Sequence, residues 1–290
     1  MWSDLVYLSS LLEVEMTSYY RIETYIKNLP QESRPRDPDA MMPEWPTQGT
    51  VDIRNLTAGY SLDESEVLKD VSFSAQSGER VAIVGRTGSG KSSLALSLLR
   101  LTTLLHGSII IDGVDVESLG IDQLRQRISL IPQDPTLFDG TMRFNLDPSS
   151  RISDEHLQTV LDDVVGAQHK WHLDDPVADN GRNFSHGERQ LIVLARAIVS
   201  QNRIVILDEG TASLDPVSEA RIHAALRDRF HDCTVITITH RLHGVVDFDQ
   251  VLVLDRGQVV EQGGPRKLLT AGEGWFRTLY MQQNGPSTTE

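Results

Sequence analysis

The sequence predicts an α/β fold built on a mainly parallel β-sheet. From Val51 onward, apolar runs of strand length alternate with helical patterns, which is typical of this fold class. Several of these runs are apolar throughout, as expected of strands that are covered on both faces. Polar residues follow the runs directly. The four clearest runs are residues 80–84, 128–131, 204–207 and 235–239.

The chain divides into four parts by composition. Residues 1–28 predict a helix, because they contain no Gly or Pro and carry apolar residues at helical spacing. Residues 29–48 hold five prolines and many charges, which is linker composition. Residues 49–282 form the α/β domain, and residues 283–290 are a C-terminal tail. The apolar set of the first helix is Leu5, Leu8, Leu11, Leu12 and Met16.

Charge and cysteine content exclude several classes of protein. The 27 Lys and Arg against 41 Asp and Glu leave a net charge of −14, which disfavours nucleic acid as a partner. The single cysteine, Cys233, excludes a disulfide within the chain and is expected to be a small buried residue. No apolar run approaches the roughly 20 residues of a membrane-spanning helix.

Four of the predicted strands end in residues that suit phosphate chemistry. Gly85, Gln133, the pair Asp208 and Glu209, and His240 each come at or just after a strand end. Ligands of open α/β sheets bind beyond the carboxyl ends of the strands. We therefore expect a glycine loop, an amide, two carboxylates and an imidazole to meet at one edge.

The glycine loop is a complete G-x-x-x-x-G-K-[ST] motif, which predicts nucleoside triphosphate binding. Its glycines allow backbone N–H groups to surround phosphate oxygens at a helix N-terminus. Lys91 is predicted to neutralise the β- and γ-phosphates, and the Ser92 hydroxyl to hold Mg²⁺. The loop consists of Gly85, Arg86, Thr87, Gly88, Ser89, Gly90, Lys91 and Ser92.

The other residues at the edge have complementary roles. Asp208 fits a carboxylate that binds Mg²⁺ directly or through water, and Glu209 fits the base that polarises the attacking water. Gln133 can reach both the metal and that water. His240 can hydrogen-bond the γ-phosphate and stabilise its developing charge. Taken alone, Gln133 or His240 would be read as structural, and only the whole set favours catalysis.

A second motif occurs at residues 183–190, ahead of the strand that carries Asp208. It resembles the signature of ATP-binding-cassette (ABC) ATPases, and residues 49–282 resemble such a cassette throughout. Its central residues are Ser185, His186, Gly187 and Glu188. A stretch similar to the family's D-loop, Ser213-Leu214-Asp215, follows the second carboxylate.

Within that superfamily, several stretches resemble the second cassette of subfamily C, the multidrug-resistance-associated transporters. The stretches are Trp45-Pro46 with Gly49, residues 85–88, 131–138, 140–141 and 145–148, and residues 232–235 with 240–242. Residues 13–30 resemble the end of the last membrane helix of such a transporter. By the same resemblance, Tyr60 would stack on adenine and Ser93 would join the nucleotide site.

The resemblance implies a three-lobed cassette that binds ATP and Mg²⁺. An antiparallel β subdomain would span about residues 51–75, and a helical subdomain carrying the signature would span about residues 139–199. Two cassettes would pair head to tail around two ATP molecules, with each signature facing the partner's γ-phosphate. The implied partners are a second cassette and transmembrane domains, at the cytoplasmic face of a membrane.

Three positions depart from the family pattern. Glu188 stands where Gln is usual, His186 where a small residue is common, and Gly210 where Ala is usual. A carboxylate at position 188 would repel a partner's γ-phosphate and weaken this signature. Alternatively, Glu188 caps the helix that begins near His186, because acidic residues are favourable near a helix start. The sequence alone leaves both interpretations open.

The whole pattern predicts the ATP-hydrolysing cassette of an ABC exporter. The chain is expected to be a fragment of a longer transporter or to pair with separate membrane subunits, and the helix at residues 1–28 favours the fragment. Two alternatives remain: a remnant that binds ATP without turnover, and a soluble ABC ATPase without a transport role. A small-molecule kinase with the same glycine loop would need no signature motif.

Overall fold

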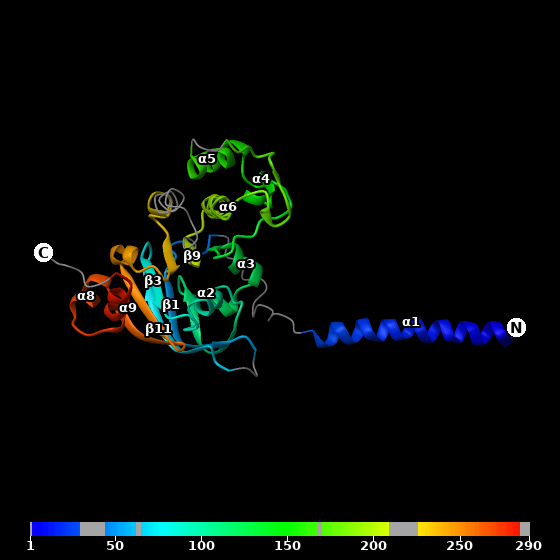
Figure 1. Cartoon of the computed structure of the whole chain (residues 1–290). Coiled ribbons are helices and arrows are strands. Elements are labelled where there is room, and N and C mark those ends of the chain that lie inside the picture. The colour runs from blue at the N-terminus through cyan, green and yellow to red at the C-terminus, as the bar shows by residue number, and fades with distance from the viewer. Residues whose placement is uncertain (1, 30–43, 62–64, 167–169, 209–225, 285–290) are drawn as a thin grey trace. The chain divides into compact units, whose positions relative to one another are not determined.

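The computed structural model describes residues 2–29, 44–61, 65–166, 170–208 and 226–284. The chain separates into two compact units, Met1–Arg34 and Pro35–Glu290. Figure 1 shows the whole chain, with the first unit in blue. The two units are described separately below.

The first unit is one helix, α1 (Trp2–Asn28). Its large apolar and aromatic side chains are exposed along its whole length, including Trp2, Tyr7 and Tyr25. None of the helices in the described ranges is both long enough and apolar enough to cross a membrane. The expected resemblance of this segment to the end of a membrane helix stays a prediction.

The second unit is centred on a six-stranded sheet in the order β12-β11-β3-β10-β9-β6. β12 pairs with its neighbour in antiparallel fashion, and the other strands are parallel to one another. The prediction of a mainly parallel sheet is confirmed. The strands are β3 (Arg80–Gly85), β6 (Ile128–Ile131), β9 (Ile204–Asp208), β10 (Thr234–Ile238), β11 (Gln250–Asp255) and β12 (Gln258–Gly263).

The register of this sheet aligns the strand ends that carry the predicted site. Gly85 pairs with Leu254, and Ile238 pairs with both Ile83 and Asp208. Ile131 pairs with Leu207, one residue before Asp208. The loops that follow β3, β6, β9 and β10 therefore start from one edge of the sheet.

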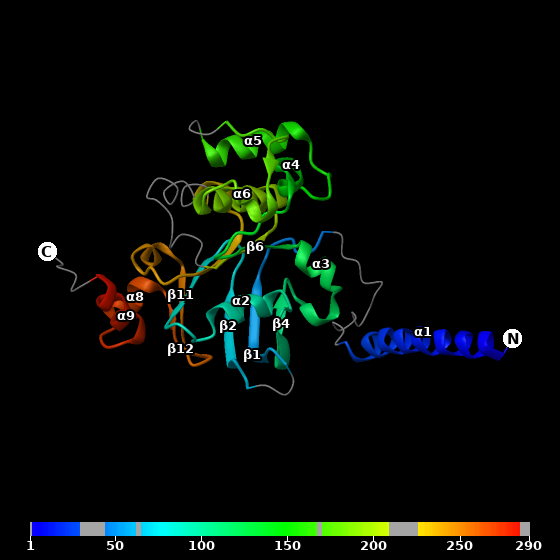
Figure 2. The same cartoon turned by 45° about the vertical axis from the view of Figure 1, so that its right-hand side comes forward.

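A second, antiparallel sheet has the order β2-β1-β4-β5. The predicted β subdomain covered only its first two strands, and β4 and β5 extend it to residue 115. β4 escaped prediction because His106 and Gly107 interrupt its apolar run. Figure 2 shows β1, β2 and β4 beside α2 (Lys91–Leu98). The strands are β1 (Val51–Gly59), β2 (Leu68–Ala75), β4 (Thr103–Ile111) and β5 (Val114–Asp115).

The helical subdomain lies together at one end of this unit (Figures 1 and 2). Its core is continuous with residues of β9 and β10, including Val205 and Val235, so it is packed onto the sheet. Its helices are α4 (Met142–Leu146), α5 (Asp154–Val165) and α6 (His186–Ser200), and its short segments are β7 (Gly140–Thr141), β8 (Pro176–Val177) and η2 (Asp179–Gly181). η1 (Val116–Ser118) and α3 (Ile121–Gln126) precede β6.

The C-terminal part forms a third apolar cluster on β3 and β11. Phe276 is fully buried there, against Ala82, Val84 and Leu242 among others. Packing within this cluster holds the C-terminal helix against β3, the strand that leads into the glycine loop. The elements of this part are η3 (His243–Asp247), α8 (Pro265–Thr270) and α9 (Trp275–Asn284).

The turn between β4 and β5 anchors the start of the domain. The carboxylate of Asp112 accepts hydrogen bonds from the backbone N–H groups of Gln48, Gly49 and Thr50 at 2.7–3.1 Å. The Thr50 hydroxyl donates a further bond at 2.9 Å. Burial by itself would raise the pKa of Asp112, but these donors lower it below the ordinary value overall.

Asp112→Asn is expected to lower the free energy of unfolding by about 1–3 kcal/mol at pH 7, because the new NH₂ group faces N–H donors. A carboxylate whose pKa is lowered in the folded state stabilises that state above its unfolded pKa of about 3.9. This stabilisation is lost as the pH falls through the folded pKa. The difference between variant and wild type should therefore narrow below about pH 4.

Urea denaturation followed by tryptophan fluorescence at pH 7 and pH 3.5 measures this difference. Asp52→Asn is the control, because among the described residues the Asp52 carboxylate pairs with Arg54 alone, on the surface. An undiminished difference at the lower pH would show that the charge of Asp112 does not stabilise the domain.

Candidate functional site

The glycine loop connects β3 to α2 in a conformation that requires glycine. Gly85, Gly88 and Gly90 all have positive φ, at 152°, 78° and 100°. A Cβ atom on Gly85 would lie 2.2 Å from the carbonyl oxygen of Leu254 in β11. A Cβ atom on Gly88 would meet nothing within 4 Å, so this part of the loop faces open space. The loop is thus closed on the side of the sheet and open on the side where a ligand would approach.

Lys91 lies inside the curve of the loop and is only 6% exposed. Its Nζ donates to the carbonyl oxygens of Gly85 at 3.1 Å and Arg86 at 2.9 Å. Phosphate oxygens are strong acceptors for an ammonium group in such a loop, because hydrogen bonds between charged groups are stronger than those between neutral groups. Lys91 therefore occupies the position that the motif predicts for it.

The Ser92 hydroxyl meets Asp208 across the site. Ser92 Oγ lies 3.4 Å from Oδ1 of Asp208, which is the last residue of β9. A hydroxyl and a carboxylate are the hard oxygen ligands that Mg²⁺ takes, with phosphates and water completing its coordination. The two side chains predicted to hold Mg²⁺ are thus adjacent, and their chemistry fits that ion.

A cleft of about 560 Å³ opens beside the loop. Gln133 from the end of β6 and His240 from the end of β10 line the same cleft as Lys91 and Ser92. The predicted meeting of four strand ends is therefore observed for the amide, the imidazole and the loop. The remaining lining residues are Val67, Thr87, Gly88, Gly90, Ser93 and Ile238.

Tyr60 and Ser93 lie next to one another at the start of α2. The Tyr60 hydroxyl and the Ser93 hydroxyl are 2.9 Å apart, and either can donate. Ser93 is buried, whereas Tyr60 is 53% exposed. An aromatic ring beside the phosphate loop is compatible with stacking on a base, and that role stays a prediction.

Ser89 of the glycine loop is buried, and its backbone is hydrogen-bonded to the hairpin of β11 and β12. Its carbonyl accepts from the N–H of Gly257, in the turn between β11 and β12, at 2.9 Å. Its hydroxyl is buried without a hydrogen-bond partner among the described residues. A Cβ atom on Gly257 would lie 2.2 Å from the carbonyl oxygen of Val67. Gly257 thus supports the glycine loop through its hydrogen bond to Ser89. The sequence did not predict this role, because the contact joins distant parts of the chain.

The signature begins α6 with a complete capping box. The Ser185 hydroxyl accepts from the N–H of Glu188 at 3.2 Å, and the Glu188 carboxylate accepts from the N–H of Ser185 at 2.7 Å. Ser-x-x-Glu and Ser-x-x-Gln both form this motif. Of the two interpretations of Glu188, the cap is therefore present in the structure.

His186 connects the signature to the loop that carries Gln133. Its Nε2 lies 3.6 Å from a carboxylate oxygen of Asp134, the residue after Gln133. This pair joins the helical subdomain to the end of β6. No signature residue, from Ser185 to Glu188, is among the described residues that line the cleft.

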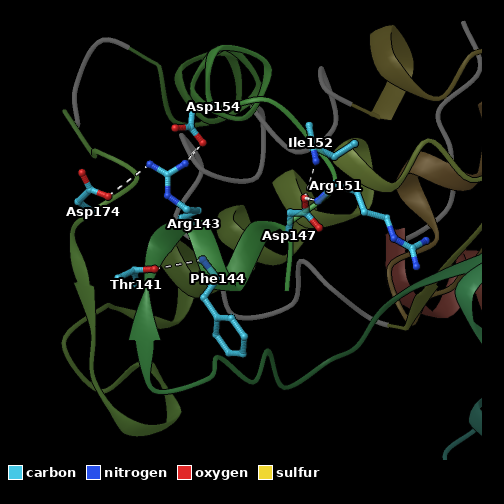
Figure 3. Close-up of polar contacts among 8 residues, drawn as sticks. All are labelled: Thr141, Arg143, Phe144, Asp147, Arg151, Ile152, Asp154 and Asp174. Carbon is cyan, nitrogen blue, oxygen red and sulfur yellow. Dashed lines mark hydrogen bonds and ion pairs between the residues drawn. The ribbon is translucent and has the colours of Figure 1, made fainter. Parts of the chain in front are cut away.

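Figure 3 shows the polar contacts that hold the short helices next to the signature helix. The Arg143 guanidinium lies between Asp154, at the start of α5, and Asp174. The Asp147 carboxylate accepts from the N–H groups of Arg151 and Ile152. Burial would raise the pKa of Asp147, but these bonds and those from Ser149 lower it overall.

A buried amide joins this region to α6 itself. Asn145 is fully buried, and its side chain bonds both the N–H and the carbonyl of Phe138. Arg196 of α6 donates to the backbone carbonyl of Asn145 at 2.6 Å. Desolvation lowers the pKa of Arg196. The sequence analysis assigned no role to either residue, since nothing local marks a contact across 51 positions.

Some predicted residues lie outside the described part of the chain. They are Glu209, the predicted base, Gly210, and the D-loop-like Ser213, Leu214 and Asp215. Their roles stay predictions from the sequence.

Comparison with known proteins agrees with this geometry. The model of the ABC transporter family matches residues 68–212, half of the 290-residue chain. The chain is 47% identical over 82% of its length to the ATP-binding cassette transporter abc1 of Schizosaccharomyces pombe, of which the match covers 17%. It is 43% identical over 96% of its length to the probable multidrug resistance-associated protein lethal(2)03659 of Drosophila melanogaster, covering 21% of that protein.

Two further similarities agree on the type of cassette. The chain is 40% identical over 92% of its length to the ATP-binding cassette sub-family C member 3 of Mus musculus, covering 18% of it. The structure of a bacterial Atm1-family ABC exporter with ATP bound matches 94% of the chain with a TM-score of 0.83 and 30% identity, over 47% of that chain. The chain thus spans about a fifth of the length of these curated relatives. It belongs to the ABC transporter family, as an ATP-binding cassette of the subfamily C, multidrug-resistance-associated type.

Proposed function

We propose that this chain binds and hydrolyses ATP to power an exporter, in a head-to-tail pair with a second cassette. The observation that carries the proposal is the single cleft that joins Lys91, Ser92, Gln133 and His240. These four residues follow three strands that are far apart in the sequence, β3, β6 and β10, and each suits a different part of the same reaction.

Binding would depend mainly on the glycine loop. Its open side at Gly88 would receive the phosphates, with backbone N–H groups and the N-terminus of α2 as donors. Lys91 would contact the β- and γ-phosphates. Mg²⁺, held by Ser92 and Asp208 with Gln133 in reach, would neutralise charge on the phosphate oxygens. Tyr60 would support the base.

Hydrolysis would transfer the γ-phosphoryl group to water. The water oxygen forms a bond to the γ-phosphorus, and the bond to the β–γ bridging oxygen breaks with its electron pair leaving on ADP. Glu209 would accept the proton of the water, and His240 would donate a hydrogen bond to the γ-phosphate as charge develops there. Gln133 would orient the water.

A second cassette would complete each ATP site. The α6 N-terminus, at Ser185 and Gly187, would face the γ-phosphate bound by the partner, while the partner's signature faces the ATP of this chain. Closure on ATP and reopening after hydrolysis would move transmembrane domains between two states. The site would then lie at the cytoplasmic face of a membrane. Glu188 makes the signature of this chain the weaker of the two.

Lys91→Ala is expected to weaken Mg·ATP binding by about 10- to 100-fold, because a hydrogen bond to a charged group contributes about 1.5–3 kcal/mol. Isothermal titration calorimetry on the full chain measures this affinity. Lys69→Ala, which removes an exposed lysine on β2, is the matched control. Wild-type affinity in the Lys91 variant would contradict the assignment of the phosphate site.

Glu209→Gln is expected to preserve Mg·ATP binding and to reduce turnover by about 10² to 10⁴, the usual contribution of a general base. Steady-state phosphate release and ATP affinity are measured on the same preparation. A loss of less than tenfold would show that Glu209 is not the base. If the wild-type chain binds ATP but shows no turnover even with a second cassette, the chain is a non-catalytic remnant.

Glu188→Gln is expected to strengthen ATP-dependent pairing by on the order of 1 kcal/mol, because Gln keeps the capping box while the negative charge near the partner's phosphate is removed. Light scattering with and without Mg·ATP measures the association. Glu188→Ala is the comparison, since it loses the cap as well and should lower the thermal stability of the chain. Weaker association of the Gln variant would mean that the carboxylate acts only as a cap.

A further inference from the structure

The last helix reaches the loop that carries His240 through one side chain. The Gln283 amide nitrogen donates to the His240 carbonyl oxygen at 2.5 Å, and its amide oxygen accepts from the N–H of Leu242 at 3.1 Å. One amide therefore makes two hydrogen bonds to the backbone of a three-residue segment. The two bonds set the direction of the backbone on both sides of Arg241.

The position of Gln283 follows from the way α9 is buried. Phe276, Tyr280 and Gln283 are spaced four and three residues apart, so they lie on one face of the helix. Phe276 is fully buried, and Tyr280 packs against the same cluster, 6.1 Å from the Phe276 ring. Gln283 continues this face one turn beyond Tyr280, where it is exposed and the helix meets the loop after β10.

The other end of α9 is also held. The N–H of Phe276 donates to the Glu261 carboxylate in β12 at 2.6 Å. Phe276 itself packs against Val84, one residue before the glycine loop begins. The helix therefore has little freedom to shift relative to β3. Through its two hydrogen bonds, Gln283 holds the segment from His240 to Leu242 against this helix.

Leu242 also holds the loop in place, through the packing of its own side chain. Its side chain is 2% exposed and belongs to the same cluster as Phe276. The segment is thus fixed at Leu242 by packing and at both of its backbone ends by Gln283. His240, which lines the cleft, is the residue whose direction these constraints determine.

We propose that Gln283 is a positioning residue that holds His240 in its place against the γ-phosphate. The inference rests on the proposed function of His240 and extends it to a residue of the C-terminal helix. Gln283 is not among the described residues that line the cleft, and its hydrogen bond to His240 is to the backbone carbonyl, so it acts through the loop. A displaced imidazole would still allow ATP to bind, because the glycine loop and Lys91 are unaffected.

Gln283→Leu tests this role, because leucine removes both the donor and the acceptor from an exposed position. We expect Mg·ATP affinity within about twofold of wild type and turnover reduced by roughly 3- to 30-fold, since small misplacement of a reacting group lowers the rate more than the binding. Gln282→Leu is the matched control. Gln282 is exposed in the same helix, and its side chain makes no hydrogen bond within the described ranges.

A second variant separates the two bonds. Gln283→Glu keeps an oxygen that can accept from the N–H of Leu242 but places a carboxylate against the His240 carbonyl. We expect its turnover to fall as in the leucine variant. Wild-type turnover in the Glu variant would overturn the claim that the bond to His240 matters.

The imidazole of His240 provides a readout that does not depend on activity. Its ring resonances in a carbon–proton spectrum are assigned by their loss in His240→Gln, on the full chain without nucleotide. They are expected to move in Gln283→Leu and to stay unchanged in Gln282→Leu. Unmoved resonances in Gln283→Leu would overturn the inference. Absence of ATP binding by the wild-type chain would instead overturn the proposed function and leave this spectral test decisive.

Discussion

The backbone contact between the glycine loop and the hairpin of β11 and β12 is the constraint on which the site depends. Two glycines make it possible: a Cβ atom on Gly85 would lie 2.2 Å from the Leu254 carbonyl, and one on Gly257 would lie 2.2 Å from the Val67 carbonyl. The Gly257 N–H also donates to the Ser89 carbonyl within the loop, and Lys91 donates to the carbonyls of Gly85 and Arg86. The sheet register then places Asp208 opposite Ser92. A side chain at Gly85 or Gly257 would push neighbouring strands apart as well as disturb the glycine loop. The shape of the phosphate site therefore depends on the packing of the core.

Glu188 departs from the family pattern without disturbing the start of α6, and the proposed function makes the same residue unfavourable for pairing. Glu188 serves the capping box as well as Gln would, since both side chains offer an oxygen to the N–H of Ser185. For the isolated helix a carboxylate is even favourable, because it interacts with the positive end of the helix dipole. That same positive end is what a partner's phosphate would need. Under the proposed pairing, the stability of α6 and the strength of a paired site would therefore be opposed at this one position.

The parts that could be predicted from the sequence are those with a local signal. The four apolar runs became strands, and the residues after three of them, Gly85, Gln133 and His240, line or border one cleft, because parallel strands place their carboxyl ends at one edge. β4 was missed where His106 and Gly107 interrupt the apolar pattern. Gln283 was assigned to the tail, although the structure places it in α9 and 43 positions separate it from its partner His240. A polar side chain that hydrogen-bonds to a distant backbone group leaves no periodic pattern in the sequence, so such a contact could not be predicted.

The groups around the cleft are held by different means, and this difference bears on how the site works. Lys91 and Ser92 follow a loop whose shape is imposed by backbone contact with the core. Gln133 lies at the junction with the helical subdomain, where the neighbouring Asp134 meets His186 of the signature. The segment that carries His240 is bonded by the Gln283 amide of the C-terminal helix and by the Thr239 hydroxyl, which accepts from the N–H of Arg241. The proposed phosphate site thus lies on a loop held by the core, whereas Gln133 and His240 lie on loops linked to other parts of the domain. In the proposed cycle, movement of those parts would alter turnover without releasing the nucleotide.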